Sequence, residues 1–165
     1  IGWLLLLFLT ESLTGSVLRH FEEEMAAVVS LAFFIPLLIG TGGNAGSQTT
    51  STIIRALAVE DLARRGLWRP LLHELGVGLV LGGLMGITAY ARALLWGTGT
   101  PVALTVAVAI FAIVVWANVL GSVLPIMAHR LKIDPTVVSG PAMSTLVDAT
   151  GLFIYFTVAG LILAF

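Results

Sequence analysis

The sequence predicts an all-α integral membrane protein with five membrane-spanning helices. The chain has 165 residues, of which 58% are hydrophobic and only 10% are charged, and its mean hydropathy is +1.06. A soluble domain carries about 25% charged residues, so the composition places nearly all of this chain in a bilayer. Five apolar segments approach or exceed the roughly 20 residues that cross about 30 Å of hydrocarbon. They cover about residues 3–18, 25–54, 71–95, 101–128 and 136–164.

The connections between these segments are short, so we expect a single membrane domain over residues 1–165. The chain begins at Ile1 and has no basic signal region with a cleavage site. We therefore expect it to be the membrane part of a longer protein. It has no cysteine, which excludes disulfides, thiolate metal sites and cysteine catalysis.

The basic residues predict the orientation of the chain. Six of its eight Lys and Arg residues lie in the second-to-third and fourth-to-fifth connections, on one side of the membrane. They are Arg55, Arg64, Arg65, Arg69, Arg130 and Lys132. Cytoplasmic loops are enriched in such residues, so we expect the amino end inside and the carboxyl end outside the plasma (inner) membrane. Trp3 and Trp68 suit the inner interface, Trp96 suits the outer one, and Trp116 suits packing within the fourth segment.

Acidic residues near the amino end allow two interpretations each. Glu11, inside the first segment, either lines a pathway or pairs with a donor such as Asn118. The run from Glu22 to Glu24 lies on the outer side. It either concentrates cations at a pore mouth or forms a solvated turn.

The second segment contains the unusual stretch PLLIGTGGNAGSQTTS at residues 36–51. Its proline and four glycines predict a helix that is weakened or broken locally, and irregular backbone at membrane depth occurs only where it is buried or lines water. Small residues alone would also suit a helix–helix interface. Asn44 and Gln48, one turn apart on one face, favour a wet pathway, and both roles can coexist. The full stripe is Leu37, Gly40, Thr41, Asn44, Ser47, Gln48 and Ser51.

The third and fourth segments carry signs of helix packing. Glycines recur at four-residue spacing in the third segment, at Gly78, Gly82 and Gly86, which is typical of close helix–helix contact. His73 and Glu74 at its cytoplasmic end suit interfacial solvation better than a metal site.

The fourth segment combines Asn118, Gly121 and Pro125. Proline within a helix favours a kink, and the asparagine amide can form an interhelical hydrogen bond.

Asp148, near the middle of the fifth segment, is the strongest functional candidate. A carboxylate at that depth costs roughly 2.5–3.5 kcal/mol on the insertion scale, and such residues mark functional sites by default. The alternative is a buried aspartate that only hydrogen-bonds a neighbouring helix. Steps of three and four residues place small and polar neighbours around it. They are Val137, Pro141, Ser144, Thr145, Gly151 and Tyr155.

The motifs of common enzymes are absent from the sequence. It has no H-E-x-x-H, G-x-S-x-G or phosphate loop, and an intramembrane aspartyl protease would need a second facing acid. No basic face with interleaved aromatic residues predicts nucleic-acid binding. We therefore expect no enzyme activity.

Two runs resemble the membrane domain of the MgtE family of magnesium channels. They are PLLIGTGGNAGSQTTSTIIRALA, with G-G-N-A-G-x-Q at residues 42–48, and VVSGPAMSTLVDATGLFIYF, with V-D-x-T-G at residues 147–151. They occur in this order, separated by two spans, and the resemblance covers essentially the whole chain.

The resemblance implies a homodimer of five-helix subunits with the pore on the twofold axis. It implies that helices two and five line the pore and that Asp148 binds Mg²⁺ there. It also implies cytoplasmic N and CBS domains that precede the membrane part in the full-length protein and sense Mg²⁺. The expected pore-lining residues are Gly40, Thr41, Asn44, Ser47, Gln48, Pro141, Ser144, Thr145 and Gly151, with Glu11 and Asn118 as weaker candidates.

The expected mechanism is passage of a largely hydrated divalent cation down the membrane potential. Mg²⁺ dehydrates reluctantly, and Mn²⁺, Co²⁺, Ni²⁺ or Ca²⁺ are candidate substitutes. Two alternatives remain at this point. One is a secondary transporter that exchanges a divalent cation against Na⁺ or H⁺, and the other is a membrane scaffold subunit that conducts no ions.

Overall fold

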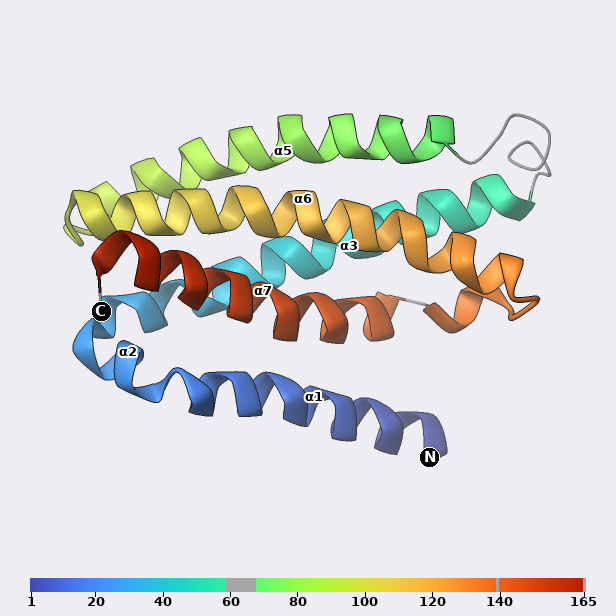
Figure 1. Cartoon of the computed structure of the whole chain (residues 1–165), viewed down its shortest axis with the longest axis horizontal. Helices are drawn as coiled ribbons and strands as arrows, with labels where there is room; N and C mark the ends of the chain where they lie inside the picture. The colour runs from blue at the N-terminus through green and yellow to red at the C-terminus, as the bar shows by residue number, and fades with distance from the viewer. Residues whose placement is uncertain (59–67, 139, 165) are drawn as a thin grey trace.

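A computed structural model describes residues 1–58, 68–138 and 140–164, and these residues form helices joined by short connections (Figure 1). Side chains of Trp3, Trp68 and Arg69 lie outside what is described, as do Arg64 and Arg65 entirely. The elements are α1 (Gly2–His20), α2 (Glu22–Ala27), the 3₁₀ helix η1 (Val29–Phe34), α3 (Ile35–Ala58), α5 (Trp68–Leu95), α6 (Thr100–Arg130), the 3₁₀ helix η2 (Pro135–Val138) and α7 (Gly140–Leu163).

The long helices lie roughly parallel to one another and alternate in direction (Figure 1). α6 is the central element, because it packs along α5, α3 and α7, and α3 also packs along α7. α1 lies at the edge of the bundle, where α7 is its main contact. The interior between α3, α6 and α7 therefore forms the core of the fold.

Four helical segments are long and apolar enough to cross a membrane. They are Val29–Ala58, Pro70–Leu95, Thr100–Arg130 and Gly140–Leu163. The prediction of an all-α membrane protein is thereby confirmed, but with four such segments among the described residues, where five were expected. α1, with 19 residues, is not among the four.

The second predicted segment, about 25–54, is not one continuous helix. Val28, with φ −134° and ψ 82°, separates α2 from η1, and α3 begins only at Ile35. The predicted break within residues 36–51 is wrong, because α3 runs unbroken to Ala58. Pro36 falls in the first helical turn, where a missing N–H is tolerated. The chain is therefore irregular before the glycine-rich stretch and regular within it.

The glycines of α3 allow the backbones of three helices to approach closely. A methyl group at Gly42 would lie 2.6 Å from Ile113 Cγ2 in α6, and one at Gly46 would lie 2.9 Å from Met143 Cε in α7. In α6, a methyl group at Gly121 would lie 2.7 Å from the Gly46 carbonyl oxygen. Of the two roles expected for this stretch, close packing is thus seen directly.

A buried tyrosine joins α7 to η1 at one end of the bundle. The hydroxyl of Tyr155, whose residue is fully buried, donates to the Leu31 carbonyl at 3.0 Å. Leu31 belongs to η1, whose 3₁₀ geometry leaves backbone groups in need of other partners. The bond therefore anchors the irregular entry into α3 on α7.

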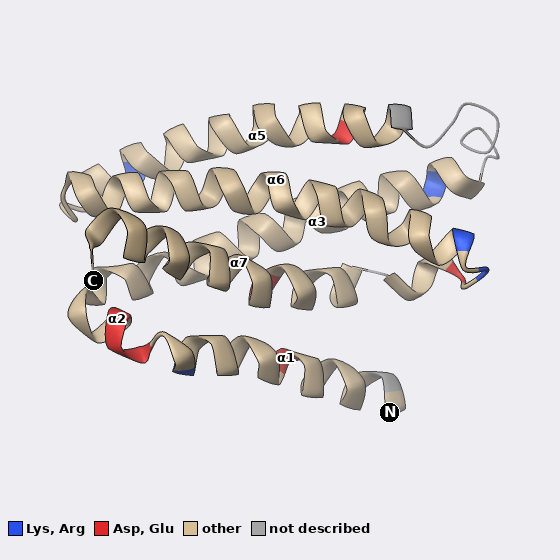
Figure 2. Ribbon diagram, in the orientation of Figure 1, with Lys and Arg blue, Asp and Glu red and all other residues tan. Residues whose placement is uncertain are grey.

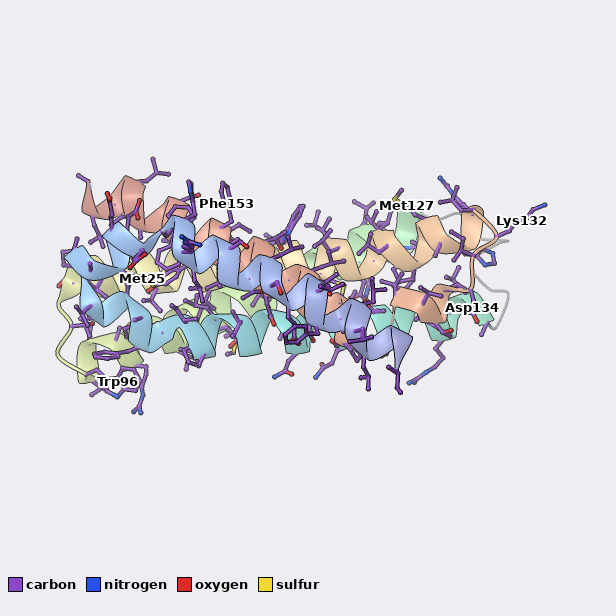
Figure 3. All side chains as sticks on the ribbon, turned by 90° about the horizontal axis from the view of Figure 1, so that it is seen from below. Met25, Trp96, Met127, Lys132, Asp134 and Phe153 are labelled. Atoms are coloured by element: carbon purple, nitrogen blue, oxygen red, sulfur yellow. The ribbon has the colours of Figure 1, made fainter. Side chains whose placement is uncertain are left out.

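Lys132 and Trp96 mark opposite ends of the bundle (Figure 3). Figure 2 shows basic stretches where α3 and α6 end, and Figure 3 shows Lys132 and Asp134 at that end and Trp96 at the other. The guanidinium of Arg92 lies 4.6 Å from the centre of the Trp96 ring. Which end faces the cytoplasm stays a prediction.

Gly121→Ala should destabilise the fold by about 1–3 kcal/mol, the usual cost of overpacking. The added methyl would press on a backbone carbonyl, which cannot move aside as a flexible side chain can. Unfolding in mixed detergent micelles, followed by tryptophan fluorescence, measures the change. Gly160→Ala is the matched control, since no atom of another residue lies within 4 Å of that site. Equal stability of the two variants would contradict the prediction.

Asp134 should titrate below the ordinary range of an aspartate. Its Oδ1 accepts the backbone N–H of Thr136 at 2.9 Å, and this bond, together with one from the Thr136 side chain, lowers the pKa of the carboxyl. A lowered folded-state pKa means that the contribution to stability is present at neutral pH and is lost as pH falls through that pKa. Carbonyl-labelled NMR, assigned with Asp134→Asn, measures the midpoint. Thr136→Val should raise it part of the way, and an unshifted midpoint in the parent would sink the prediction.

Candidate functional site

A groove of about 360 Å³ runs between α3 and α7 and contains the Asp148 carboxylate. Asp148, in the middle of α7, is half-buried. The remaining lining residues are Pro36, Ile39, Gly40, Gly43, Asn44 and Ser144. The two polar runs singled out in the sequence therefore meet in one groove, although they lie about a hundred residues apart.

Gly43 lets the acid approach α3. A methyl group on Gly43 would lie 3.3 Å from the Ser144 hydroxyl and 3.6 Å from Asp148 Oδ1. Any larger side chain at this position would reach into the space in front of the carboxylate. The glycine thus keeps open the part of the groove where an ion would contact Asp148.

A second polar groove, of about 410 Å³, continues along α3 toward its carboxyl end. Asn44 lines both grooves, so they form one strip. The other residues of the second groove are Ser47, Gln48, Ser51, Thr52 and Arg55. The Ser47 hydroxyl lies 3.5 Å from that of Ser144 and 3.4 Å from the Gly140 carbonyl oxygen, which ties the start of α7 to α3.

The lining chemistry suits a hydrated cation. Asp148 supplies a carboxylate, and the neighbouring groups are an amide and hydroxyls. In the described part of the chain, no cluster of three or more His, Cys, Asp or Glu residues could hold a metal ion. Six waters around an octahedral ion occupy about 180 Å³ at about 30 Å³ each, which the groove of about 360 Å³ accommodates. A single carboxylate in such a space contacts an ion through water more readily than it encloses a bare one.

Four predicted pore residues lie elsewhere. Thr41 is half-buried and Pro141 is exposed, and neither is among the residues that line the two polar grooves. Thr145 is buried and donates to the Pro141 carbonyl at 3.0 Å. Gly151 is buried with a methyl position 3.4 Å from Ile113 Cγ2. Steps of three and four residues from Asp148 select a wider face of the helix than the face that lines the groove.

Glu11 approaches the site from α1. It is exposed, and its charge is near enough to act on that of Asp148. The acidic stretches of α1 and α7 lie at about the same level along the bundle (Figure 2). The alternative pairing of Glu11 with Asn118 is wrong, because Asn118 is 1% exposed and bonds to other residues.

A larger apolar groove, of about 750 Å³, lies between α1, α6 and α7. Its lining includes Leu13, Val17, Phe21 and Phe153, which do not suit a hydrated ion. Trp116 reaches it from α6 and donates its ring N–H to the Thr150 hydroxyl at 3.0 Å. The expected packing role of Trp116 therefore includes a hydrogen bond.

Glu74 was assigned to the membrane interface from the sequence, and that assignment is wrong. It is only 8% exposed, within the span Pro70–Leu95. Its Oε2 accepts the Thr49 hydroxyl at 3.2 Å, and its backbone carbonyl accepts Asn118 Nδ2 at 3.4 Å. The sequence does carry a signal for this burial, since Glu74 begins the same four-residue spacing that continues at Gly78.

Comparison with known proteins gives one consistent family. The family model MgtE, described as a divalent cation transporter, matches residues 35–158. A protein named magnesium transporter MgtE from Thermus thermophilus is 44% identical over 164 residues, which cover 99% of this chain and 36% of that protein. Proteins of the same name from Bacillus subtilis and Enterococcus faecalis are 32% and 33% identical, covering 95% and 99% of this chain and 35% and 36% of theirs. The chain thus spans about a third of the length of these relatives.

Proposed function

The chain belongs to the MgtE family of divalent cation transporters, and from this premise we propose that it forms an ion channel that admits Mg²⁺ to the cytoplasm. The observation that carries the proposal is the groove in which Asp148 of α7 meets Asn44 of α3. The names of the relatives support Mg²⁺ as the ion.

Asp148 binds the ion through its water shell in this proposal. Mg²⁺ holds its waters in a near-octahedral shell and releases them reluctantly, so a carboxylate that accepts hydrogen bonds from those waters binds without stripping them. The amide and hydroxyl groups of Asn44, Gln48 and Ser144 contact the same waters. Because these groups are neutral, they bind weakly enough to let the ion leave. Mn²⁺, Co²⁺, Ni²⁺ and Ca²⁺ are candidate substitutes.

The membrane potential supplies the driving force. A divalent cation moving inward gains about 4.6 kcal/mol per 100 mV, twice the value for a single charge. No counter-ion is needed for net uptake, which favours a channel over an exchanger.

The assembly we propose is a homodimer with the pore on its twofold axis. The polar strip of α3 is exposed in the single chain, and a wet face at membrane depth requires either protein or water against it. A twofold axis along this strip would bring two Asp148 carboxylates to one pathway. α1, whose 19 residues reach about 28 Å, then serves as the fifth span.

The basic end of the bundle faces the cytoplasm in this proposal, since cytoplasmic loops carry the excess of Lys and Arg. The amino end is then inside. The relatives are about three times longer than this chain, and we propose that cytoplasmic regulatory domains gate the pore in the full-length protein.

Replacement of Asp148 should strongly reduce voltage-driven Mg²⁺ uptake. The measurement is Mg²⁺ flux into liposomes that contain the purified protein, with a K⁺ diffusion potential as the driving force. Asp148→Ala and Asp148→Asn should each reduce the flux by about tenfold or more, because loss of a charge-assisted bond of about 1.5–3 kcal/mol corresponds to at least that factor. Asp134→Asn, which removes an exposed acid outside the spans, should retain the parental flux.

Each other outcome favours a different function. Flux that requires an opposing Na⁺ or H⁺ gradient would replace the channel by a coupled exchanger. No flux from folded parental protein, with or without such a gradient, would favour a scaffold subunit. Equal flux in the parent and in Asp148→Ala would remove Asp148 from the mechanism.

Cross-linking tests the twofold axis separately. Because the parent has no cysteine, Asn44→Cys introduces a single thiol on the polar strip. A short bifunctional thiol reagent should join two copies of this variant in membranes. Ile87→Cys, on the exposed side of α5, is the control and should remain monomeric on a denaturing gel. The reverse pattern would place the dimer contact on α5 and refute the proposed axis.

A further inference from the structure

The buried polar cluster of Glu74, Thr49 and Asn118 joins three helices inside the membrane. Thr49 lies in α3, Glu74 in α5 and Asn118 in α6, and their exposed fractions are 5%, 8% and 1%. The Thr49 hydroxyl lies 3.2 Å from both Glu74 Oε2 and Asn118 Oδ1. Asn118 Nδ2 donates to the Glu74 backbone carbonyl at 3.4 Å, which closes the cluster.

Among the described residues, Thr49 alone bonds this cluster to α3. It follows Gln48 directly, and successive residues on a helix point about 100° apart. The exposed face of α3 carries Asn44 and Gln48, whereas the face with Thr49 and Thr50 is buried. A bond that fixes the direction of Thr49 therefore also fixes the direction of the amides on the exposed face.

Packing also limits the rotation of α3. Its Leu38 and Ile53 are buried, and the side chains of Ile113 and Met143 lie against Gly42 and Gly46. In α5, Gly78 likewise meets the Asn118 side chain, with its methyl position 3.0 Å from Nδ2. Hydrogen bonds add a dependence on direction to this packing. Single buried polar residues are known to fix the register of packed helices in this way.

The hydrogen count gives Glu74 a specific part in the cluster. A threonine hydroxyl carries one hydrogen, so Thr49 can donate to either Glu74 Oε2 or Asn118 Oδ1 at one moment. Asn118 is held independently through Nδ2, and the His73 ring Nδ1 lies 3.4 Å from Glu74 Oε1. Glu74 in α5 and Asn118 in α6 are therefore alternative acceptors for the single Thr49 hydrogen.

We propose that Glu74 is a positioning residue that sets the rotation of α3 through Thr49 and thereby turns Asn44 and Gln48 toward the ion pathway. The significance of this rotation for ions rests on the proposed function. The rotation itself does not, and it can be measured without any ion flux.

Cysteine labelling reports the rotation directly. In the cysteine-free parent, Gln48→Cys should react quickly with a membrane-impermeant maleimide, and Thr50→Cys, at a position that is 1% exposed, should react slowly. Adding Glu74→Leu places an apolar side chain of similar length there, which cannot accept a hydrogen bond. It should lower several-fold the ratio of the labelling rate at position 48 to that at position 50. Glu74→Gln keeps an acceptor for Thr49 and should restore the ratio.

A second variant separates the effect of losing the hydrogen bond from the effect of misfolding. Thr49→Val preserves the shape of the side chain and removes the donated hydrogen, so it should lower the same ratio as Glu74→Leu does. Size-exclusion profiles in detergent identify folded samples. An unchanged ratio in either folded variant would overturn the proposal. Failure of both variants to fold, with Glu74→Gln intact, would also overturn it, because the cluster would then serve stability alone.

Ion-flux measurements on the same variants test whether rotation of α3 affects the passage of ions. If α3 rotates, the ratio of Mg²⁺ to Ca²⁺ flux should change in Glu74→Leu and return in Glu74→Gln. A parent without flux, but with the expected labelling changes, would reject the proposed function and leave the positioning role in place. Parental selectivity in Glu74→Leu, together with a changed labelling ratio, would overturn the link to the pathway.

Discussion

The close approach of α3 to α6 and α7 is the constraint on which the rest of the structure depends. Gly42 and Gly46 fit closely against side chains of α6 and α7, and Gly121 leaves no room for a methyl group against the Gly46 carbonyl. This approach brings Gly43 against the Asp148 carboxylate on one side of α3. On the other side it brings Thr49 within hydrogen-bond distance of Glu74. The same contact thus builds the polar groove and the buried cluster behind it.

Much of the fold follows from the length of the apolar segments, but the shape of the second segment does not. Glycine costs about 1 kcal/mol in a helix relative to alanine, and four glycines with a proline predicted a break. In the fold, those glycines are the contact surface, and packing against α6 and α7 offsets their low helix propensity. The irregular part lies instead at Val28 and η1. There the Tyr155 hydroxyl donates a hydrogen bond that no local sequence pattern predicts.

The candidate site was predictable where polar residues interrupt apolar segments, as Asn44, Gln48 and Asp148 do. Thr145 and Gly151 were expected beside Asp148 because they share its helical face, yet the groove follows only the narrow contact with α3. The burial of Glu74 was not predicted, because its position near the end of a segment suggested exposure to water. Its four-residue spacing from Gly78 was the better guide, since residues on one helical face share one environment.

The position of α1 has a consequence for how the chain is assembled in the membrane. α1 packs mainly against α7, so the first of the described helices to be synthesised finds its principal neighbour in the last of them. Domains and helices emerge from the amino end onward during synthesis, and the other large contacts join helices closer together in the chain. The main contact of α1 therefore forms only after α3, α5 and α6 have been synthesised, and this edge of the bundle closes only when translation of α7 is complete.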